Sequence, residues 1–521
     1  MLLALVFLSG GLSAQQLPVG DDGEDYYRLL GLVGKVPPNS FVIRPSVRAD
    51  ARVSIDSATD HPWSLHFPAS VPAGTAPRYR ILDPQLHLYA NSAFPAGQND
   101  GVVWQGRGVT AALDGGVFLR AGPVSATLRP ELIYTQNRAF PLASVLQTGR
   151  TIYANPYHPL NSQGSIDLPQ RFGPDPFWKL DPGQSSLRLD YGGATLGVAT
   201  ENLWWGPGIR NAIVMSNNAP GFPHAFLATG RPVNVGIGRL EALWTWGWLA
   251  RPTGFSDSLP SGRHHRFLTG LAVAFEPKPF PGLFLGGTRL FYEEVPASGL
   301  GFGEYFLIFQ RVTKKGSATP SNPTGNDQRD QLASLFARWL LPGSGFEVYV
   351  EWARNDFNWD LRDLFLEPEH SQAYTIGFQK GLALSNGRLL RLNGELTHLE
   401  RSATLQVRAT PAYYVHSLIS EGYTQRGQVI GAGIGPGSDA QYLGADLFTR
   451  WGRIGTAISR QVHDNDAYYA TAATALGFQG HYVEGKWDLS GLVFLPGFDL
   501  GGTLEVSRHL NRYYLLRNDH T

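Results

Sequence analysis

One stretch of the chain, residues 201–224, combines side chains that could bind a sugar with a break in local structure. An indole ring can pack on the apolar face of a sugar, while guanidinium and amide groups can hydrogen-bond to its hydroxyls. Neither Gly-Pro nor Pro-Gly can continue a β-ladder, so the stretch is predicted to be a strand end that breaks into a loop. The candidate residues for polysaccharide binding or for a loop plug are Trp204, Trp205, Gly206, Pro207, Gly208, Arg210, Asn217 and Asn218.

No arrangement of residues indicates catalysis. The sequence contains no His-Glu-x-x-His, no Walker loop, no Gly-x-Ser-x-Gly elbow and no Cys. Adjacent His264 and His265 point to opposite faces of a strand, and the polar run from Asn355 to Asp360 lacks EF-hand spacing. We therefore predict no catalytic residue, no metal site, no cofactor and no enzymatic activity. A hydrolase that uses acids from separate strands, such as Glu351, stays an alternative.

Composition narrows the class of protein. The formal net charge is +0, which argues against nucleic acid as a partner. Beyond residue 12, no apolar run approaches the roughly 20 residues of a membrane-spanning helix. The chain has 61 Gly, 13 Trp, 21 Tyr and 28 Phe but only 2 Met, a bias typical of β-barrels and also of large soluble β-sandwiches or propellers.

The beginning of the chain predicts export. The apolar run from Leu2 to Leu8 and the small residues up to Ala14 suit a cleaved signal peptide over residues 1–14. Residues 15–107 are predicted to form an N-terminal periplasmic region, helical or irregular, that leads into the first strands. Acidic residues from Asp21 onward, followed by apolar residues up to Val33 at helical spacing, predict one short amphipathic helix there.

From about residue 108 to residue 521 the pattern has period two, which indicates strands with two different faces. Leu187 and Leu189 share one face of a predicted strand, and Arg188 and Asp190 share the other. The same alternation recurs around residues 347–352, 390–397 and 482–489. In a soluble sandwich the polar face would meet water, and in a membrane barrel it would meet the lumen, so alternation leaves both open. The exported, aromatic-rich context favours the barrel.

The connections and aromatic residues add to the barrel prediction. Long polar connections over residues 137–184, 252–264, 316–328 and 356–371 contrast with tight glycine turns, as in outer-membrane barrels. About 23 residues per strand and connection gives roughly 18 strands. Trp244, Trp246 and Trp248 alternate along one strand and are predicted to share a lipid-facing girdle. The adjacent Trp204 and Trp205 are predicted to face opposite ways, one toward lipid or the membrane interface and the other inward, toward the lumen or the loops.

Three patches of the sequence resemble the Wzi-type capsule assembly proteins. In that family a Trp-Trp-Gly-Pro-Gly run leads into Ser-Asn-Asn, as residues 204–208 lead here into 216–218. The other two patches are Asn99-Asp100-Gly101 with Trp104-Gln105-Gly106-Arg107-Gly108, and Tyr27-Arg28-Leu29-Leu30 before Val36-Pro37-Pro38.

The resemblance implies an all-β fold, a transmembrane antiparallel β-barrel with a small periplasmic helical element and long outer loops that plug the lumen. It implies a lectin-like protein of the outer membrane that attaches or organises capsular or extracellular polysaccharide at the cell surface. The expected partners are this polymer and outer-membrane lipid, and the protein is expected to be a monomer. The alternatives are an outer-membrane porin, general or sugar-selective, and a polysaccharide or lipid hydrolase.

Overall fold

The computed structural model describes most of the chain. The described residues are 15–16, 18–45, 47–48, 61–63, 78–145, 151–157, 164–250, 253–255, 265–310, 329–355, 361–406, 408, 410, 412–473 and 480–514. The predicted signal peptide, residues 1–14, lies outside them. Among the described residues, no helix combines the length and the apolarity needed to cross a membrane.

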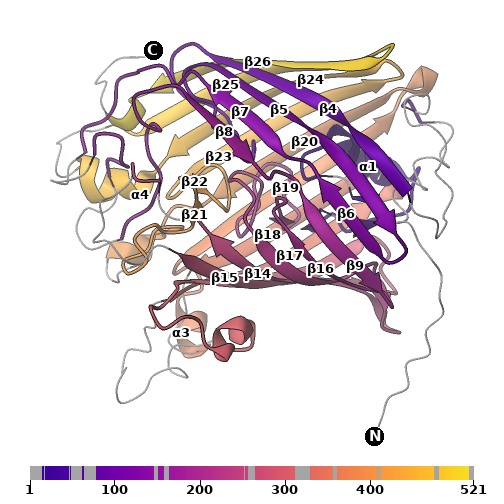
Figure 1. Ribbon diagram of the computed structural model, residues 1–521, viewed down its shortest axis with the longest axis horizontal. Helices are drawn as coiled ribbons and strands as arrows, with labels where there is room; N and C mark the ends of the chain where they lie inside the picture. Colours follow the sequence, from indigo (N-terminus) through magenta and orange to yellow (C-terminus); the bar gives the residue numbers. More distant parts are fainter. Residues whose placement is uncertain are drawn as a thin grey trace, which may run out of the picture.

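Antiparallel β-strands arranged around a barrel dominate the structure (Figure 1). Most neighbours in the barrel follow one another along the chain, and the strand order places β26 next to β4. The barrel strands are β4 (Arg78–Asn91), β5 (Gly108–Ala121), β6 (Val124–Leu128), β7 (Glu131–Thr135), β8 (Phe177–Asp181), β9 (Ser186–Tyr191), β10 (Ala194–Ala199), β12 (His224–Thr229), β13 (Val233–Asn234), β14 (Gly238–Leu249), β15 (Arg266–Pro277), β16 (Leu283–Glu294), β17 (Arg329–Leu341), β18 (Phe346–Asn355), β19 (Gln372–Ala383), β20 (Leu389–His398), β23 (Asp439–Thr449), β24 (Gly452–His463), β25 (Tyr482–Leu495) and β26 (Phe498–Leu510).

The remaining elements are short. Three two-stranded pairs lie outside the barrel order: β1 (Gln15–Gln16) with β3 (Val47–Arg48), β2 (Ile43–Arg44) with β11 (Trp204–Trp205), and β21 (Thr424–Gln425) with β22 (Gln428–Val429). The α-helices are α1 (Asp22–Leu32), α3 (Leu361–Leu366) and α4 (Asn465–Ala467), and η6 (Tyr468–Ala472) is a π-helix. The 3-10 helices are η1 (Phe302–Phe309), η3 (Pro342–Ser344), η4 (Ser385–Gly387), η5 (Ala403–Gln406) and η7 (Arg512–Tyr514).

The two faces of the barrel wall have opposite chemistry, and the polar face is the buried one. On β18, Val348 and Val350 are each 39% exposed, whereas Glu347, Tyr349 and Glu351 are at most 1% exposed. The predicted alternation is therefore confirmed, with charges turned inward and aliphatic side chains turned outward. Other strands repeat this pattern. Their exposed residues include Leu187, Leu392, Leu396, Trp487 and Leu489, and their buried residues include Arg188, Arg391, Glu395 and Glu484. A surface that exposes aliphatic residues and buries charges is typical of a barrel that meets lipid.

The connections between barrel strands are short at one end and long at the other. Short ones cover residues 122–123, 192–193, 278–282, 342–345, 384–388, 450–451 and 496–497. Long ones cover residues 92–107, 136–176, 200–223, 250–265, 295–328, 356–371, 399–438 and 464–481. The predicted inequality is therefore present. In outer-membrane barrels the short turns lie at the periplasmic end.

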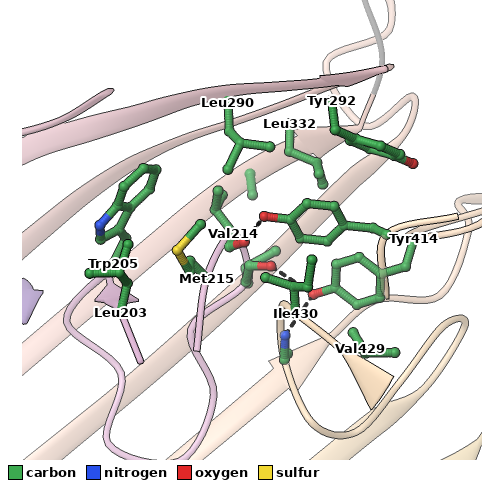
Figure 2. Packing of buried hydrophobic residues seen from close by; sticks show 14 of the residues in the cluster. Leu203, Trp205, Val214, Met215, Leu290, Tyr292, Leu332, Tyr414, Val429 and Ile430 are labelled. Atoms are coloured by element: carbon green, nitrogen blue, oxygen red, sulfur yellow. Dashed lines mark hydrogen bonds between the residues drawn. The ribbon is translucent and has the colours of Figure 1, made fainter. Parts of the chain in front are cut away.

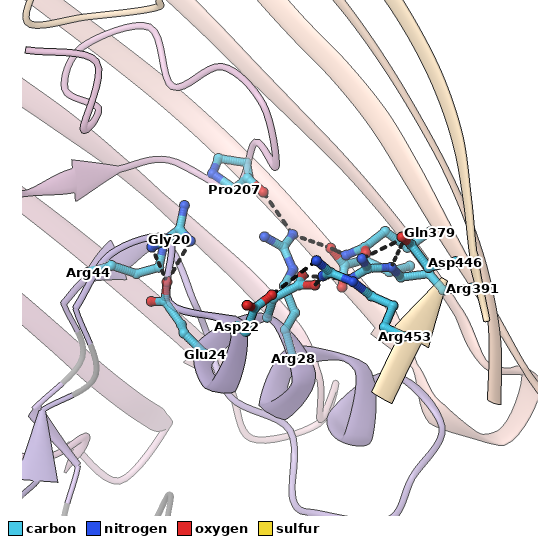
Figure 3. A network of polar contacts seen from close by, with 12 residues as sticks. Gly20, Asp22, Glu24, Arg28, Arg44, Pro207, Gln379, Arg391, Asp446 and Arg453 are labelled. Carbon is cyan, nitrogen blue, oxygen red and sulfur yellow. Dashed lines mark hydrogen bonds and ion pairs between the residues drawn. The ribbon is translucent and has the colours of Figure 1, made fainter. Parts of the chain in front are cut away.

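Helix α1 lies inside the barrel, near the end with short turns (Figure 3). It forms where the sequence predicted a helix, since the Asp21 side chain accepts a hydrogen bond from the Gly23 N–H at 2.8 Å and caps it. Its Tyr26 and Leu30 are fully buried and belong to one apolar cluster with residues of the barrel wall, among them Leu340 and Phe448. The wall already includes β4, which begins at residue 78, ahead of the change of pattern at residue 108.

Candidate functional site

The two adjacent tryptophans lie inside the barrel, and both are buried. They form β11, which pairs with β2 from the N-terminal segment rather than with a barrel strand. Trp204 is 2% exposed and Trp205 is 0% exposed. The prediction that one of these rings faces lipid is therefore wrong. Residues 200–223 leave the wall as an inserted loop, so protein covers both faces of β11.

Each indole has its own packing partners. The Arg44 guanidinium lies over the Trp204 ring, 4.3 Å from its centre. Trp205 belongs to the large apolar cluster of the lumen with Leu203, Met215 and Leu290 (Figure 2). The backbone N–H of Trp205 also donates to the Met215 carbonyl at 2.9 Å. Both rings therefore stabilise the loop.

The Gly-Pro-Gly turn is fixed from two sides. Gly206 has a φ of +126°, and a Cβ there would lie 2.8 Å from the Glu351 carboxylate, so only glycine fits without strain. A Cβ on Gly208 would lie 2.0 Å from the Asn211 carbonyl oxygen. The Pro207 carbonyl accepts a 2.8 Å hydrogen bond from Arg28 of α1. The turn thus joins the inserted loop to α1.

Two carboxylates on the barrel wall accept hydrogen bonds from the backbone of this loop. The N–H groups of residues 209, 210 and 211 donate to Glu395 at 2.7, 3.1 and 2.8 Å, and the Tyr349 hydroxyl donates to it at 2.8 Å. Glu351 accepts from the Ile213 N–H at 3.2 Å. Glu351, the carboxylate considered for a lumen hydrolase, is fully buried and holds the inserted loop.

Charged pairs tie α1 to the barrel wall (Figure 3). Arg28 forms an ion pair with Glu347, which also pairs with Arg338 at 2.5 Å. Asp25 pairs with Arg391 at 2.5 Å. Burial by itself would raise the pKa of the Asp25 carboxyl, but the guanidinium of Arg391 outweighs it and lowers this pKa. α1 is therefore a charged plug as well as an apolar one.

The amide side chains of the motif hold loops together. Asn217 Nδ2 donates to the Asn99 carbonyl at 2.9 Å, and Asn218 Nδ2 donates to the Val429 carbonyl at 3.0 Å. Asn99 Nδ2 in turn donates to the Arg210 carbonyl at 2.7 Å. The patches that carry the family resemblance thus meet in the lumen, at contacts between the loops around residues 99, 217 and 429.

Arg210 and Asn218 are the half-buried candidates, and Arg210 is the one whose side chain stacks on an aromatic ring. Its guanidinium lies over the Tyr442 ring, 4.8 Å from the centre. It also lies close enough to Asp100 to lower the pKa of that carboxyl, although burial dominates and raises this pKa to about 7. An arginine stacked on a tyrosine beside a carboxyl can offer both hydrogen bonds and a ring face to a sugar.

Sequence reasoning found the loop but missed the residues that hold it. Glu347, Glu395 and Arg28 were visible as charges on a strand face or on a helix, without any sign of their partners. Tyr414 and Tyr423 donate to the carbonyls of residues 213 and 214 at 2.7 and 2.8 Å. They come from the 399–438 connection, which was not predicted as a long loop. No local pattern links these positions to the motif.

One group of residues has metal-ligand chemistry. Within the described part of the chain, His398, Glu400 and Asp439 each offer a ligand atom within 4.8 Å of the others. His398 Nδ1 lies 2.6 Å from Asp439 Oδ1, so this histidine already has a partner. Of the polar run at 355–360, only Asn355 is described, and its Nδ2 donates to the Ala412 carbonyl.

Comparison with known proteins identifies the same family as the sequence motifs. The family model described as capsule assembly protein Wzi matches residues 94–467. No curated protein matches the chain. Among solved structures, the chain is similar in fold to Wzi of Escherichia coli, an outer membrane protein involved in group 1 capsule assembly and described as a carbohydrate-binding β-barrel. The TM-score is 0.59 and the identity 12%, covering 95% of this chain and 96% of that one.

Two further structural similarities are weaker. Acinetobacter baumannii OccAB2 has a TM-score of 0.39 and 9% identity, covering 83% of this chain and 92% of that one. A BenF-like porin from Pseudomonas fluorescens Pf-5 has a TM-score of 0.37 and 8% identity, covering 83% and 93%. At these TM-scores the similarity carries no argument about function.

Proposed function

The chain belongs to the family of the capsule assembly protein Wzi, and on this basis we propose that it attaches or organises capsular or extracellular polysaccharide at the cell surface. It resides in the outer membrane, as its outward aliphatic and inward charged faces support. It acts by binding, without catalysis. The observation that carries the proposal is the filled lumen, in which the 200–223 and 399–438 loops share one apolar cluster and α1 packs against the wall in another.

The finer architecture is part of this proposal. The barrel closes between β4 and β26 into a membrane-spanning cylinder of roughly 18 strands, because β6 and β7, which both pair with β5, count as one strand, and so do β12 and β13, which both pair with β14. Residues 1–14 are removed as a signal peptide, residues 15–107 include strand β4 and the helix α1, which plugs the lumen at the short-turn end instead of standing in the periplasm, and residues 108–521 form the rest of the barrel. The protein works as a monomer surrounded by outer-membrane lipid. These statements rest on the short and long connections and on the charged plug at the short-turn end.

The eight motif residues divide into two roles. Seven of them build the plug, because their rings and amides are engaged inside the protein. These seven are Trp204, Trp205, Gly206, Pro207, Gly208, Asn217 and Asn218. Arg210, with Tyr442 beside it, contacts the polymer from the lumen. A single contact of this kind is weak, but a repeating polymer that meets many copies of the protein would be held by avidity.

Retention on immobilised polysaccharide tests the proposal. The probe is capsular or extracellular polysaccharide from the organism that makes the protein, and the variants are Arg210→Ala and the matched control Arg388→Ala in an exposed turn. Loss of a charged hydrogen bond of about 1.5–3 kcal/mol predicts binding at least about tenfold weaker for Arg210→Ala. The control is expected to bind like the wild type.

Two results would count against this function. Equal retention of Arg210→Ala and wild type would remove Arg210 from the binding site. Absence of any retention of the wild-type protein, together with unchanged polymer shedding after deletion of the gene, would remove the polysaccharide role itself.

A further inference from the structure

A segment of one long connection lies on the outside of the barrel. The 3-10 helix η1 follows β16 in the 295–328 connection and packs against β15 and β16. The indole N–H of Trp246 donates to the Tyr305 carbonyl at 2.8 Å, and the Tyr305 ring packs edge-on against Phe267, 5.2 Å away. Trp246 and Phe267 face outward, since the alternate residues of β15, such as Leu268, belong to the lumen cluster.

The burial of the wall beneath η1 confirms this position. Outward-facing Phe267, Thr269 and Phe291 are fully buried. Outward residues beyond its reach remain open, with Leu285 40% exposed and Leu335 63% exposed. The predicted girdle of Trp244, Trp246 and Trp248 is on one outer face, and η1 covers part of it. η1 therefore shields a limited area of the barrel exterior.

Hydrogen-bond donors of a charged residue on the outer wall are satisfied by this segment. Arg289 lies near the middle of β16, and its guanidinium donates to the carbonyls of Ile308 and Gln310 at 2.9 and 2.6 Å. It also donates to Gln331 at 3.0 Å and lies over the Phe291 ring, 4.8 Å from its centre. A guanidinium facing hydrocarbon is costly unless its donors are satisfied. The carbonyl groups at the end of η1 supply the acceptors that the Arg289 guanidinium needs on this outer wall.

The depth of η1 follows from the wall residues it touches. Trp244 contacts the rings of Phe306 and Phe309, at 5.4 and 5.5 Å. It lies five residues before the end of β14, which corresponds to about 16 Å along the strand. η1 therefore runs back from the long-connection end, alongside wall residues that face lipid in the proposed orientation.

The outer face of η1 is apolar. Phe302 is 81% exposed, Phe306 38% and Phe309 69%, while Leu307 and Ile308 are buried against the wall. The Phe302 and Phe306 rings lie 4.9 Å apart, and Glu304, the acidic residue of η1, is half-buried. The surroundings of the three rings at this depth must therefore be apolar as well, since exposing three phenylalanines to water is unfavourable.

We propose that η1 is a membrane anchor that inserts its Phe302, Phe306 and Phe309 face among the acyl chains of the outer leaflet and so fixes the 295–328 connection to the bilayer. Leu307 and Ile308 hold it to the wall, and the Arg289 hydrogen bonds fix its depth. The inference goes beyond polysaccharide binding, although it relies on membrane residence of the barrel.

Site-directed spin labelling can test the anchor directly, because the chain contains no Cys and a single introduced one is unique. Phe309→Cys is labelled in the full-length protein in phospholipid vesicles. Accessibility to oxygen, which partitions into lipid, is compared with accessibility to a water-soluble nickel chelate. Leu335→Cys on the outer wall serves as the lipid control, and Leu418→Cys, 54% exposed in the 399–438 loop, as the water control.

The ratio of oxygen to nickel accessibility at position 309 is expected to match that at 335 and to exceed that at 418 several-fold. A ratio like that at 418 would overturn the anchor. A water-like ratio at 335 would instead overturn membrane residence, so the two failures are distinguishable. Spin–spin broadening at 309 that disappears on dilution with unlabelled protein would assign the face to a second copy and also overturn the proposal.

Discussion

Glu395 lies on the barrel wall, and its carboxylate binds backbone N–H groups of the inserted loop. Its carboxylate accepts from three successive N–H groups of the inserted loop and from the Tyr349 hydroxyl. Three N–H groups converging on one anion make the kind of concave site that anions occupy elsewhere. Here a side chain of the same protein fills it, which explains how a loop rich in glycine can keep one conformation.

Replacing Glu395 should loosen the plug. In Glu395→Ala the buried donors lose their charged acceptor, which should cost about 3 kcal/mol of unfolding free energy. Urea unfolding in detergent measures the cost, and conductance in planar bilayers reports the plug, with a nearly silent wild type and a conducting variant. Glu505→Ala on β26 is the matched control, because Glu505 pairs with Lys486 and holds no loop. Identical behaviour of the two variants would contradict this role.

Asp100 should make stability depend on pH. Burial raises the pKa of this carboxyl from 3.8 to about 7, and Gln105 donates to it at 2.8 Å. Since the folded state holds the proton more tightly than the unfolded state, the contribution is fully present below pH 3.8 and is lost as pH rises toward 7. At about 1.4 kcal/mol per pKa unit, the loss amounts to roughly 4 kcal/mol.

Thermal unfolding of Asp100→Asn in detergent provides the measurement. The variant should melt near the wild-type temperature at pH 4 and above it at pH 8, because the amide cannot ionise. A wild type whose melting temperature is the same at both pH values would show that Asp100 is ionised in the folded state without cost.

At the scale of elements, α1 and the inserted loop act as one plug. Arg28 connects them, since it donates to the Pro207 carbonyl and pairs with Glu347 of the wall. Arg338 also pairs with Glu347, so the wall carboxylate keeps one partner if Arg28 is lost. Removing Arg28 therefore tests the connection between α1 and the loop without leaving an isolated buried charge.

Arg28→Met should release α1 while the barrel stays folded. Loss of the ion pair and of the Pro207 hydrogen bond is expected to cost about 2–3 kcal/mol locally. Hydrogen exchange over residues 22–32 should become roughly thirty- to a hundredfold faster, because about 1.4 kcal/mol corresponds to tenfold. Arg388→Met in a turn controls for the loss of a surface charge. Unchanged exchange in α1 would show that apolar packing alone holds it.

Across the whole molecule, the barrel wall distributes charged and aliphatic side chains in the opposite way to a soluble protein. Charged residues such as Arg338 and Glu347 have no exposed surface, while Leu335 is 63% exposed. The lumen is nonetheless filled, because loops and α1 bring their own apolar residues, such as Trp205 and Tyr26, inward. The barrel wall therefore has lipid-like surroundings outside and a packed protein core inside.

A charge placed on the outer wall measures this arrangement. Ile376 is 48% exposed in the middle of β19, and Leu384 is 41% exposed just beyond its end. Ile376→Arg should lower the unfolding free energy in lipid vesicles by about 2–4 kcal/mol, and Leu384→Arg by about 0–1 kcal/mol. Equal, small effects of the two substitutions would show that no hydrocarbon surrounds β19.

Local sequence pattern specifies the barrel wall and helix α1. Alternation along residues 347–352 depends only on neighbouring positions, because successive side chains of a strand point to opposite faces. The acids and apolar spacing from Asp21 likewise fix α1 locally. Only the tertiary structure decided that Trp204 and Trp205 are both buried and that Glu395 and Arg28 hold their loop. The contacts of Arg28 with Pro207 and of Glu395 with Ile209 join positions more than 170 residues apart. A local sequence pattern cannot indicate which distant residue a side chain will contact.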